Sequence, residues 1–192
     1  RIVDAQGRDC PPGEAGEFVV RPKYPNTLMA GYYGMPEKSL EAFRQLWFHS
    51  GDKGTCDQNG YFFFLDRMKD AIRRRGENIS SFEVERILNL HEDVAECAAI
   101  AIKAEDGEDE LKVVVVPNRS VGLSAEALLD YCVDAMPYFM VPRYIEFKSD
   151  LPRTPTQKVR KIELREEGIT PGTWDREQAG IRVTRHGVEK ST

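Results

Sequence analysis

The sequence predicts an α+β fold in which a small β-rich subdomain is followed by a compact mixed-sheet βα domain. Short runs with β propensity, bounded by turn residues, occur at 16–21 and 61–65. A cationic segment poor in hydrophobic residues follows at 66–79 and is typical of a connection between two packed units. Beyond it, predicted strands and helices come in mixed order, which favours α+β over a doubly wound sheet.

The first part of the chain contains two short predicted strands, at 1–4 and 16–21, separated by a Gly/Pro-rich turn. Pro36 suits the first turn of a helix, which we expect to carry one apolar face. The Asp-Gln-Asn-Gly run at 57–60 supplies turn chemistry before the aromatic run, so a hairpin is predicted there. The apolar helical positions are Leu40, Phe43, Leu46 and Trp47.

The second part opens with a capping box, Ser80-x-x-Glu83, which predicts a helix of about three turns. Strands are predicted at 94–102 and 111–116, with a turn at 105–108 between them. Four consecutive valines in the second strand predict burial on both faces. The apolar face of the helix is formed by Val84, Ile87, Leu88 and His91.

Ser124 is expected to cap another helix, which Pro137 ends, and a further strand is predicted at 144–147. Past Lys161 the sequence becomes polar and patternless, so we expect residues from about 170 onward to be frayed. The core face of the helix is formed by Leu128, Leu129, Cys132, Val133 and Met136.

Composition narrows the class of protein. The chain has 192 residues, 41% hydrophobic and 31% charged, as in ordinary soluble globular proteins. No apolar run approaches the roughly 18 residues of a membrane span, and the net charge of −5 argues against a nucleic-acid binder. The four cysteines and three histidines lack metal-ligand spacing, so we expect no metal site, reduced thiols and a cytoplasmic location. The chain starts Arg-Ile-Val-Asp, without a signal peptide, and we expect it to begin within a longer protein.

Three sets of residues have the chemistry of a nucleotide site. Asp52 follows Gly51, and a carboxylate in such a turn can accept hydrogen bonds from both hydroxyls of a ribose. The alternative is a solvated turn aspartate. The cations from Arg67 to Arg75 are equally compatible with a solvated basic segment. Lys158 follows two prolines that stiffen its approach, and its alternative is a surface loop lysine.

Taken in order, these segments resemble the adenylate-forming superfamily, which includes acyl-CoA synthetases, peptide-synthetase adenylation domains and luciferases. The similarity covers roughly residues 1–165 and implies the C-terminal part of an AMP-dependent acyl-CoA ligase. The segments that carry it are Gly16-Glu-Phe through Tyr32, Trp47-Phe-His-Ser-Gly-Asp52, Asp66-Arg-Met-Lys69, Arg73-Arg-Arg-Gly-Glu-Asn-Ile79, Met136–Pro142 and Pro152-Arg-Thr-Pro-Thr-Gln-Lys158.

The resemblance implies a role for each matched residue. Asp52 would bind the ribose of ATP and Arg67 would be a second nucleotide contact. Lys69 would be the pivot about which the C-terminal domain rotates. Lys158 would reach the α-phosphate and the acyl carboxylate during adenylation.

Two further residues are assigned to the second half-reaction by the same resemblance. Arg73 and Gly76 would line the tunnel through which the thiol of CoA arrives, since glycine lets a ligand run against the backbone. Gln157 departs from the pattern, because the family has glycine before the lysine. That departure bears on backbone freedom in the loop and leaves the charge of Lys158 intact.

The resemblance also implies an organisation and a reaction. Residues 1–66 would end a large N-terminal domain, 67–165 would form the mobile C-terminal domain, and 166–192 would be a poorly ordered tail. A carboxylate would react with ATP, with Mg²⁺, to give acyl-AMP and pyrophosphate, and CoA would then displace AMP.

The parts of the family that bind adenine, the phosphates and the acyl group have no counterpart in this chain. We therefore expect the chain to be inactive without its large domain. The Arg-Arg-Arg-Gly-Glu-Asn-Ile run is most similar to medium- or long-chain and carnitine-type CoA ligases, which suggests fatty acid metabolism. The alternative is a non-catalytic stand-alone module that binds CoA, a carrier protein or an acyltransferase.

Overall fold

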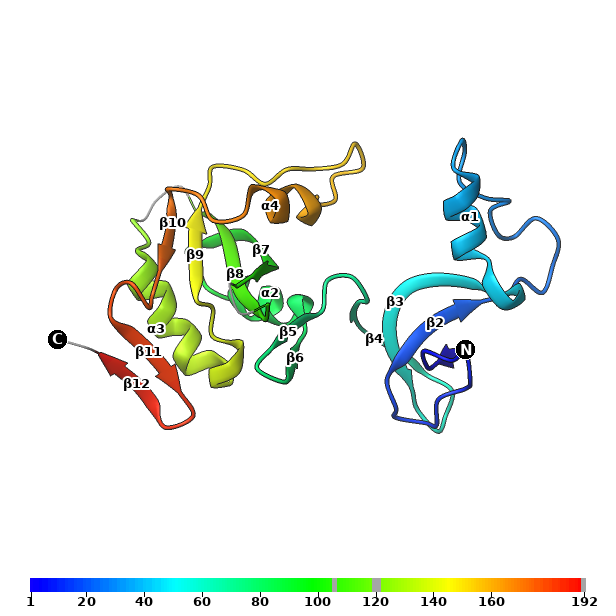
Figure 1. Ribbon diagram of the computed structural model, residues 1–192, viewed down its shortest axis with the longest axis horizontal. Helices are drawn as coiled ribbons and strands as arrows, with labels where there is room; N and C mark the ends of the chain where they lie inside the picture. Colours follow the sequence, from blue (N-terminus) through cyan, green and yellow to red (C-terminus); the bar gives the residue numbers. More distant parts are fainter. Residues whose placement is uncertain (105–106, 119–121, 191–192) are drawn as a thin grey trace. The chain divides into compact units, whose positions relative to one another are not determined.

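The computed structural model describes residues 1–104, 107–118 and 122–190. The chain divides into two compact units, with the boundary between Lys69 and Asp70. Each unit is built around its own four-stranded sheet (Figure 1).

Unit 1 is built on an antiparallel sheet in which the strands lie in sequence order, β1-β2-β3-β4. Its buried core is small and includes Ile2, Val3 and Val19 from the first two strands. The elements are β1 (Ile2–Val3), β2 (Gly16–Val20), α1 (Pro36–Ala42), the short 3-10 helix η1 (Arg44–Leu46), β3 (Phe48–Cys56) and β4 (Phe62–Arg67).

Strands β3 and β4 confirm the predicted hairpin. Asp57 closes the turn, because its Oδ1 accepts the backbone N–H groups of Asn59 at 2.9 Å and Tyr61 at 2.8 Å. Gly54 in β3 allows the strand to approach its neighbours closely, since a Cβ there would lie 2.1 Å from the ring of Phe18.

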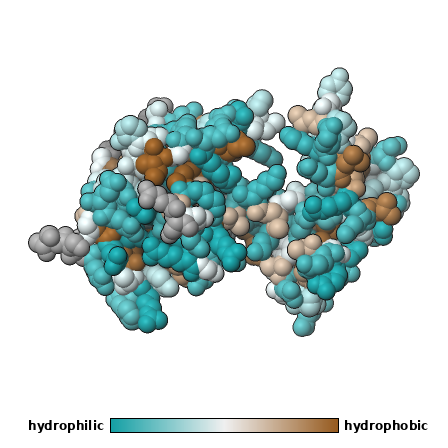
Figure 2. Space-filling model, viewed as in Figure 1, coloured by the Kyte–Doolittle hydropathy of each residue, from teal (hydrophilic) through white to brown (hydrophobic). Residues whose placement is uncertain are grey.

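The helix after Pro36 is shorter than predicted. It ends at Ala42, and the backbone of Gln45 and Leu46 turns left-handed with φ of 53° and 64°. The expected apolar face is not buried within unit 1, since Leu40 is 76% exposed. Trp47 instead lies against the Arg1 and Arg21 guanidinium groups, at 4.6 and 4.4 Å from its ring centroid. Figure 2 shows hydrophobic side chains on the surface around α1.

Unit 2 contains a mixed sheet in the order β10-β9-β8-β7, in which only the β8–β9 pair is parallel. A helix or a hairpin follows almost every strand of this sheet. The described elements are β5 (Ile72–Arg74), β6 (Glu77–Ile79), α2 (Ser81–Leu88), β7 (Val94–Lys103), β8 (Asp109–Pro117), α3 (Ala125–Ala135), η2 (Tyr138–Met140), β9 (Tyr144–Phe147), α4 (Lys161–Glu167), β10 (Thr173–Asp175), β11 (Ile181–Thr184) and β12 (Gly187–Lys190).

The sheet of unit 2 is covered on both faces, as the valine run predicted. Val113 and Val115 pack with α2 and α3, whereas Val114, one residue between them, packs with Leu164 of α4. In Figure 1, α3 and α4 lie on opposite sides of the strands. The predicted α+β class is therefore confirmed, with helices on both faces of a mixed sheet.

Both predicted helix caps are present. The Ser80 hydroxyl accepts the Glu83 N–H at 3.2 Å, and the Ser124 hydroxyl accepts the Ala127 N–H at 3.1 Å. Helix α2 ends at Leu88 and is therefore shorter than the three turns expected. The predicted turn at 105–108 lies partly outside the described residues.

The segment whose composition is typical of a connection is folded into unit 2 from Asp70 onward, which rules out the alternative of a solvated basic segment there. Residues 72–79 form the hairpin β5–β6, whose Ile72 and Ile79 are completely buried against the sheet and helices. The side chains of β5 alternate between the interior and the solvent, because Ile72 and Arg74 point inward and Arg73 points outward. The sequence did not reveal this alternation of buried and exposed side chains, because one of the buried positions is occupied by an arginine, Arg74.

Residues past 166 also differ from the expectation of a poorly ordered tail. Strand β10 pairs with β9 at the edge of the sheet, and β11 pairs with β12. Ile181 and Val183 are buried in the main hydrophobic cluster of unit 2. The compact unit thus continues beyond residue 165, to at least 190.

Candidate functional site

The two residues predicted to contact the nucleotide in unit 1 lie side by side. Asp52 in β3 and Arg67 in β4 are directly opposite each other, and Arg67 Nε lies 2.7 Å from Asp52 Oδ1. Asp52 was expected in a tight turn, but it lies within a strand just after Gly51, whose φ is 74°. Since ion pairs at a surface are weak, hydroxyl groups of a ligand can compete for this carboxylate.

A carboxylate that the sequence analysis did not select fixes the strand behind Asp52. Glu17 Oε1 accepts the N–H of Gly51 at 3.1 Å, and its Oε2 lies 2.7 Å from His49 Nδ1 and 3.1 Å from Arg44 Nη2. Burial raises the pKa of Glu17, but the hydrogen bonds from His49 and Gly51 outweigh it, so the pKa lies below its ordinary value. Glu17 therefore holds the Gly51–Asp52 backbone in place.

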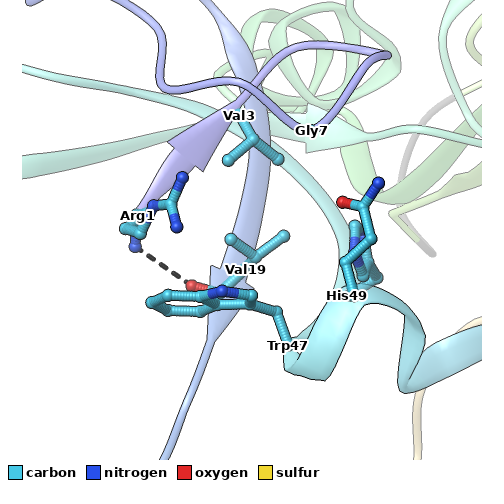
Figure 3. Close-up of a pocket in the computed structure, with 7 residues that line it drawn as sticks. Arg1, Val3, Gly7, Val19, Trp47 and His49 are labelled. Carbon is cyan, nitrogen blue, oxygen red and sulfur yellow. Dashed lines mark hydrogen bonds between the residues drawn. The ribbon is translucent and has the colours of Figure 1, made fainter.

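His49 also lines a small pocket in unit 1. The pocket has a volume of about 190 Å³ (Figure 3), smaller than the roughly 300–1,000 Å³ of typical small-molecule sites. His49 Nε2 is buried there without a hydrogen-bond partner among the described residues. The lining residues are Arg1, Val3, Gly7, Val19, Gln45, Trp47 and His49.

Lys69, the predicted pivot, is exposed and is the last residue of unit 1. The next residue, Asp70, belongs to unit 2 and forms an ion pair with Arg165 of α4. One side of the boundary is thus anchored to a helix, while the side chain of Lys69 is in solvent.

Arg73 and Gly76 lie on the hairpin β5–β6. Arg75 and Gly76 are the two turn residues, with φ of 50° and 84°, as in a type I′ turn. A Cβ at Gly76 would meet nothing within 4 Å, so the turn conformation, rather than crowding, is what calls for glycine here. Arg73 is exposed, and its backbone N–H donates to Asp109 at 3.0 Å.

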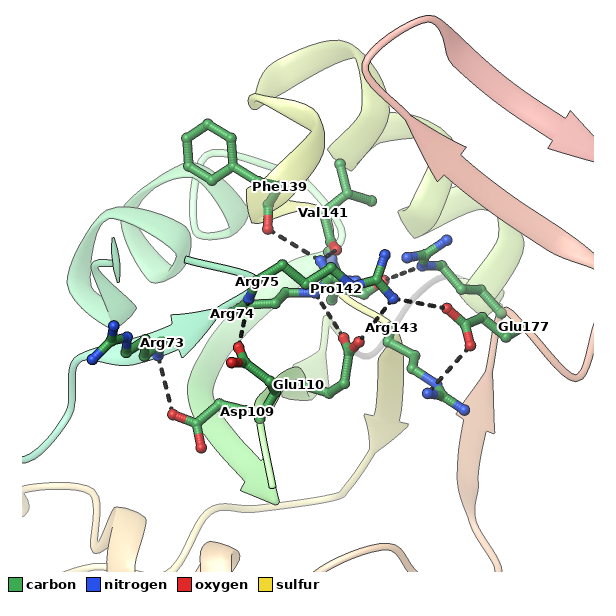
Figure 4. Close-up of polar contacts among 12 residues, drawn as sticks. Arg73, Arg74, Arg75, Asp109, Glu110, Phe139, Val141, Pro142, Arg143 and Glu177 are labelled. Carbon is green, nitrogen blue, oxygen red and sulfur yellow. Dashed lines mark hydrogen bonds and ion pairs between the residues drawn. The ribbon is translucent and has the colours of Figure 1, made fainter. Parts of the chain in front are cut away.

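Between them, Arg74 is buried and anchors the hairpin. Its Nε lies 2.7 Å from Glu110 Oε2, and its Nη1 donates to the carbonyl oxygens of Phe139 and Val141 (Figure 4). Desolvation lowers the pKa of Arg74 in spite of the opposing effect of Glu110. Neither Arg74 nor Glu110 was selected as a site residue from the sequence, because three consecutive arginines look alike there.

Lys158 lies in an exposed loop that precedes α4. The loop is closed by a bridge between Arg153 and Val159, and the Thr154 side chain accepts the N–H of Lys158 at 3.1 Å. Gln157, which stands where the resemblance expects glycine, has a φ of 66°. The position thus has the left-handed conformation that favours glycine, even though the side chain is present.

The far end of this loop is fixed to the body of unit 2. Lys161, the first residue of α4, lies 2.7 Å from Glu85 Oε1 and donates to the hydroxyl of Ser81 at 2.8 Å. The loop therefore has anchored ends and a solvent-exposed lysine near its tip.

Within the described ranges, no group of three or more His, Cys, Asp or Glu side chains is placed to hold a metal ion. In the same part of the chain, no helix combines the length and apolarity needed to cross a membrane.

Comparison with known proteins assigns this chain to a family. Residues 83–158 match the model of the AMP-binding enzyme C-terminal domain. A crotonobetaine/carnitine–CoA ligase of Salmonella heidelberg is 34% identical over 165 residues, which is 85% of this chain and 32% of the relative. The chain belongs to the adenylate-forming superfamily.

Solved structures of adenylate-forming enzymes share the fold. ATP-bound MatB from Rhodopseudomonas palustris is 32% identical with a TM-score of 0.76, covering 87% of this chain and 33% of that one. The amide bond synthetase McbA from Marinactinospora thermotolerans is 31% identical with a TM-score of 0.73, covering 86% and 34%. The chain thus spans about a third of the length of these relatives and corresponds to their C-terminal domain with a preceding segment.

Proposed function

We propose that the chain is the C-terminal portion of an ATP-dependent acyl-CoA ligase, which forms acyl-AMP from a carboxylate and ATP and then transfers the acyl group to CoA. The similarity to CoA ligases supports this proposal most directly. The placement of Lys158 near the tip of an exposed loop, where it can reach a substrate held by another domain, is the structural observation that carries it.

In the adenylation step, the carboxylate of Asp52 holds the ribose hydroxyls of ATP and Arg67 provides a second contact. Lys158 reaches the α-phosphate and the acyl carboxylate and stabilises the negative charge that develops between them. Mg²⁺ would enter with ATP and help to neutralise the charge of its phosphates.

In the thioester-forming step, the C-terminal domain rotates about Lys69, which withdraws Lys158 and brings the hairpin β5–β6 to the acyl-adenylate. Arg73 and Gly76 then border the thiol tunnel. The unit boundary beside Lys69 and the anchoring of Asp70 by Arg165 support a pivot at this position.

The substrates meet on a large domain. In the relatives, about two thirds of the length lies outside the part that this chain matches, and that part would correspond to the large domain. Exposed apolar residues in unit 1, among them Leu40, Phe62 and Phe63, suit a contact with that domain. Similarity to crotonobetaine/carnitine–CoA ligases favours an acid of the carnitine type, and a fatty acid is the other candidate. The free cysteines suit the cytoplasm. Similarity to an amide bond synthetase makes an amine the second candidate acceptor.

The test is Lys158→Ala in the full-length protein that contains this chain. We expect carboxylate-dependent exchange of pyrophosphate into ATP to fall by ~10²–10³, as when one donor to a developing charge is lost. Attack of CoA on supplied acyl-AMP should change little, because Lys158 is withdrawn in that step.

Lys23→Ala is the matched control for charge, because Lys23 is exposed in the loop between β2 and α1. Equal loss of both half-reactions in Lys158→Ala would mean that the lysine has a structural role. Exchange that is unaffected by Lys158→Ala would remove the basis for the adenylation mechanism.

A further inference from the structure

The segment that follows β10 carries charged side chains into the interior of unit 2. Arg176 is only 1% exposed, and it donates from Nε to the carbonyl of Pro142 at 3.1 Å and from Nη1 to that of Ile181 at 3.2 Å. Burial, with the neighbouring Arg74, lowers the pKa of Arg176 to about 10, so it remains charged at neutral pH. A buried charge that is bonded to backbone in this way fixes the segment in one position.

The loop that contains Pro142 also accepts hydrogen bonds from Arg74 of the hairpin β5–β6. Arg74 donates to Phe139 and Val141, and Arg176 donates to Pro142, so the two arginines hold adjacent carbonyl groups (Figure 4). The C-terminal segment and the base of the hairpin are thereby fastened to one short stretch of chain.

Carboxylates from three residues meet the turn of the hairpin, and Glu108 Oε2 accepts the backbone N–H of Arg75 at 2.8 Å. Arg75 Nη2 lies 3.4 Å from Glu110 Oε1 in β8 and 3.9 Å from Glu177 Oε1 in the C-terminal segment. Figure 4 shows the Arg75 guanidinium group between these carboxylates. Glu177 is itself held by Arg143, whose Nη1 lies 3.2 Å from Glu177 Oε2.

The turn needs such support. Each strand of the hairpin has only three residues, and an isolated two-stranded hairpin is marginally stable. Arg75 also adopts a φ of 50°, which is unfavourable for a residue with a side chain. Contacts outside the hairpin, those of Arg74 and Arg75 among them, therefore set the orientation of the turn.

We propose that Glu110 and Glu177 form a carboxylate cradle that positions Arg75 and Gly76 for the thioester-forming half-reaction, with Glu177 as a positioning residue supplied by the C-terminal segment. The inference rests on the proposed function for its role in thioester formation. The cradle itself rests on the contacts of the Arg75 side chain with Glu110 and Glu177.

The test is Glu177→Gln, which keeps the shape of the side chain and removes its charge, in the full-length protein and in the 192-residue chain. Glu189→Gln, at an exposed position on β12 of the same segment, is the matched control. In the full-length protein we expect kcat/KM for CoA to fall ~5–10-fold, mainly through KM, as when about 1 kcal/mol of positioning is lost. Pyrophosphate exchange should stay within about twofold.

In the 192-residue chain, hydrogen exchange separates positioning from chemistry. The amides of residues 75–78 should exchange several-fold faster in Glu177→Gln, while those of β7 and β8 keep their protection. A merely structural role would accelerate exchange throughout unit 2 and slow both half-reactions alike, and this would overturn the inference.

The two proposals fail in different ways. If wild-type full-length protein does not transfer an acyl group from acyl-AMP to CoA, the proposed function fails, while hydrogen exchange still decides whether Glu177 holds the turn. If the wild type is active and Glu177→Gln matches Glu189→Gln in kinetics and exchange, the cradle is wrong.

Discussion

Gln157 shows at the scale of one residue how a departure from a family pattern is accommodated. Its φ of 66° lies in the left-handed region, and the turn is closed by its N–H, which donates to the carbonyl of Thr154 at 2.9 Å. The backbone of the turn therefore keeps the conformation that glycine favours, and the side chain of Gln157 adds strain of about 1 kcal/mol.

Substitution Gln157→Gly should consequently stabilise unit 2. We expect the free energy of unfolding to rise by about 0.5–1 kcal/mol, because the relief of strain exceeds the added flexibility of the unfolded chain. Denaturant unfolding of the 192-residue chain measures this. Gln157→Ala is the control, since it removes the same side chain but keeps the Cβ, and it should give no gain. Equal gains in both variants would show that the side chain, not the backbone, is responsible.

At the scale of elements, the C-terminal hairpin β11–β12 is part of the core. Ile181 and Val183 pack in the main hydrophobic cluster, whereas Arg182 between them is exposed. Strand β10 adds an edge to the sheet, and its Asp175 accepts charged hydrogen bonds from both Nε and Nη2 of Arg143. The segment is therefore held by apolar burial and by ion pairs together.

The double substitution Ile181→Ala, Val183→Ala should lower the free energy of unfolding of unit 2 by at least about 3 kcal/mol, as expected for large-to-small changes in a core. Arg182→Ala, on the same strand, should change it by no more than about 0.5 kcal/mol. Thermal or denaturant unfolding checks both. A frayed tail would make all three substitutions equally harmless.

At the scale of the whole molecule, the chain consists of two units that divide at Lys69. Asp52 and Arg67 belong to the first, and Arg73, Gly76 and Lys158 belong to the second. The proposed reaction uses Lys158 in its first step and Arg73 and Gly76 in its second. Two units joined at a pivot suit such an exchange of residues. The chain spans about a third of the length of its relatives. In the proposed reaction these residues would therefore be one part of the machinery.

We expect the 192-residue chain alone to show no carboxylate-dependent exchange of pyrophosphate into ATP, because the segments that resemble the family's adenine and phosphate sites are not in it. An isotope-exchange assay with a panel of carboxylates measures this, with the full-length protein as the positive control. Pyrophosphate exchange by the chain alone at a rate near that of the full-length protein would contradict the proposal that the adenine and phosphate sites lie on the large domain.

The sequence predicted most elements of the fold because their signals are local. The serines at 80 and 124 mark helix caps, the Asp57–Gly60 turn marks a hairpin, and the valine run marks a strand buried on both faces. The matched motifs also led to the family. Its assignment of roles to Asp52, Arg67, Lys69, Arg73, Gly76 and Lys158 remains a prediction.

Local patterns failed where burial depends on partners far away in the chain. Three consecutive arginines look alike in the sequence, yet Arg74 is buried because Glu110 and the carbonyls of Phe139 and Val141 meet it. Arg176, in a stretch that looks like a polar tail, is buried for the same reason.

The sequence alone therefore determined the class of fold, the caps and turns, and the membership of the family, since each depends on neighbouring residues or on ordered motifs. Only the tertiary structure decided that Glu17 holds the strand of Asp52, that 72–79 is a packed hairpin, and that 173–190 completes unit 2. A buried charge is stable only if a partner reaches it, and which partner does so is set by the packing of elements that the sequence separates by tens of residues.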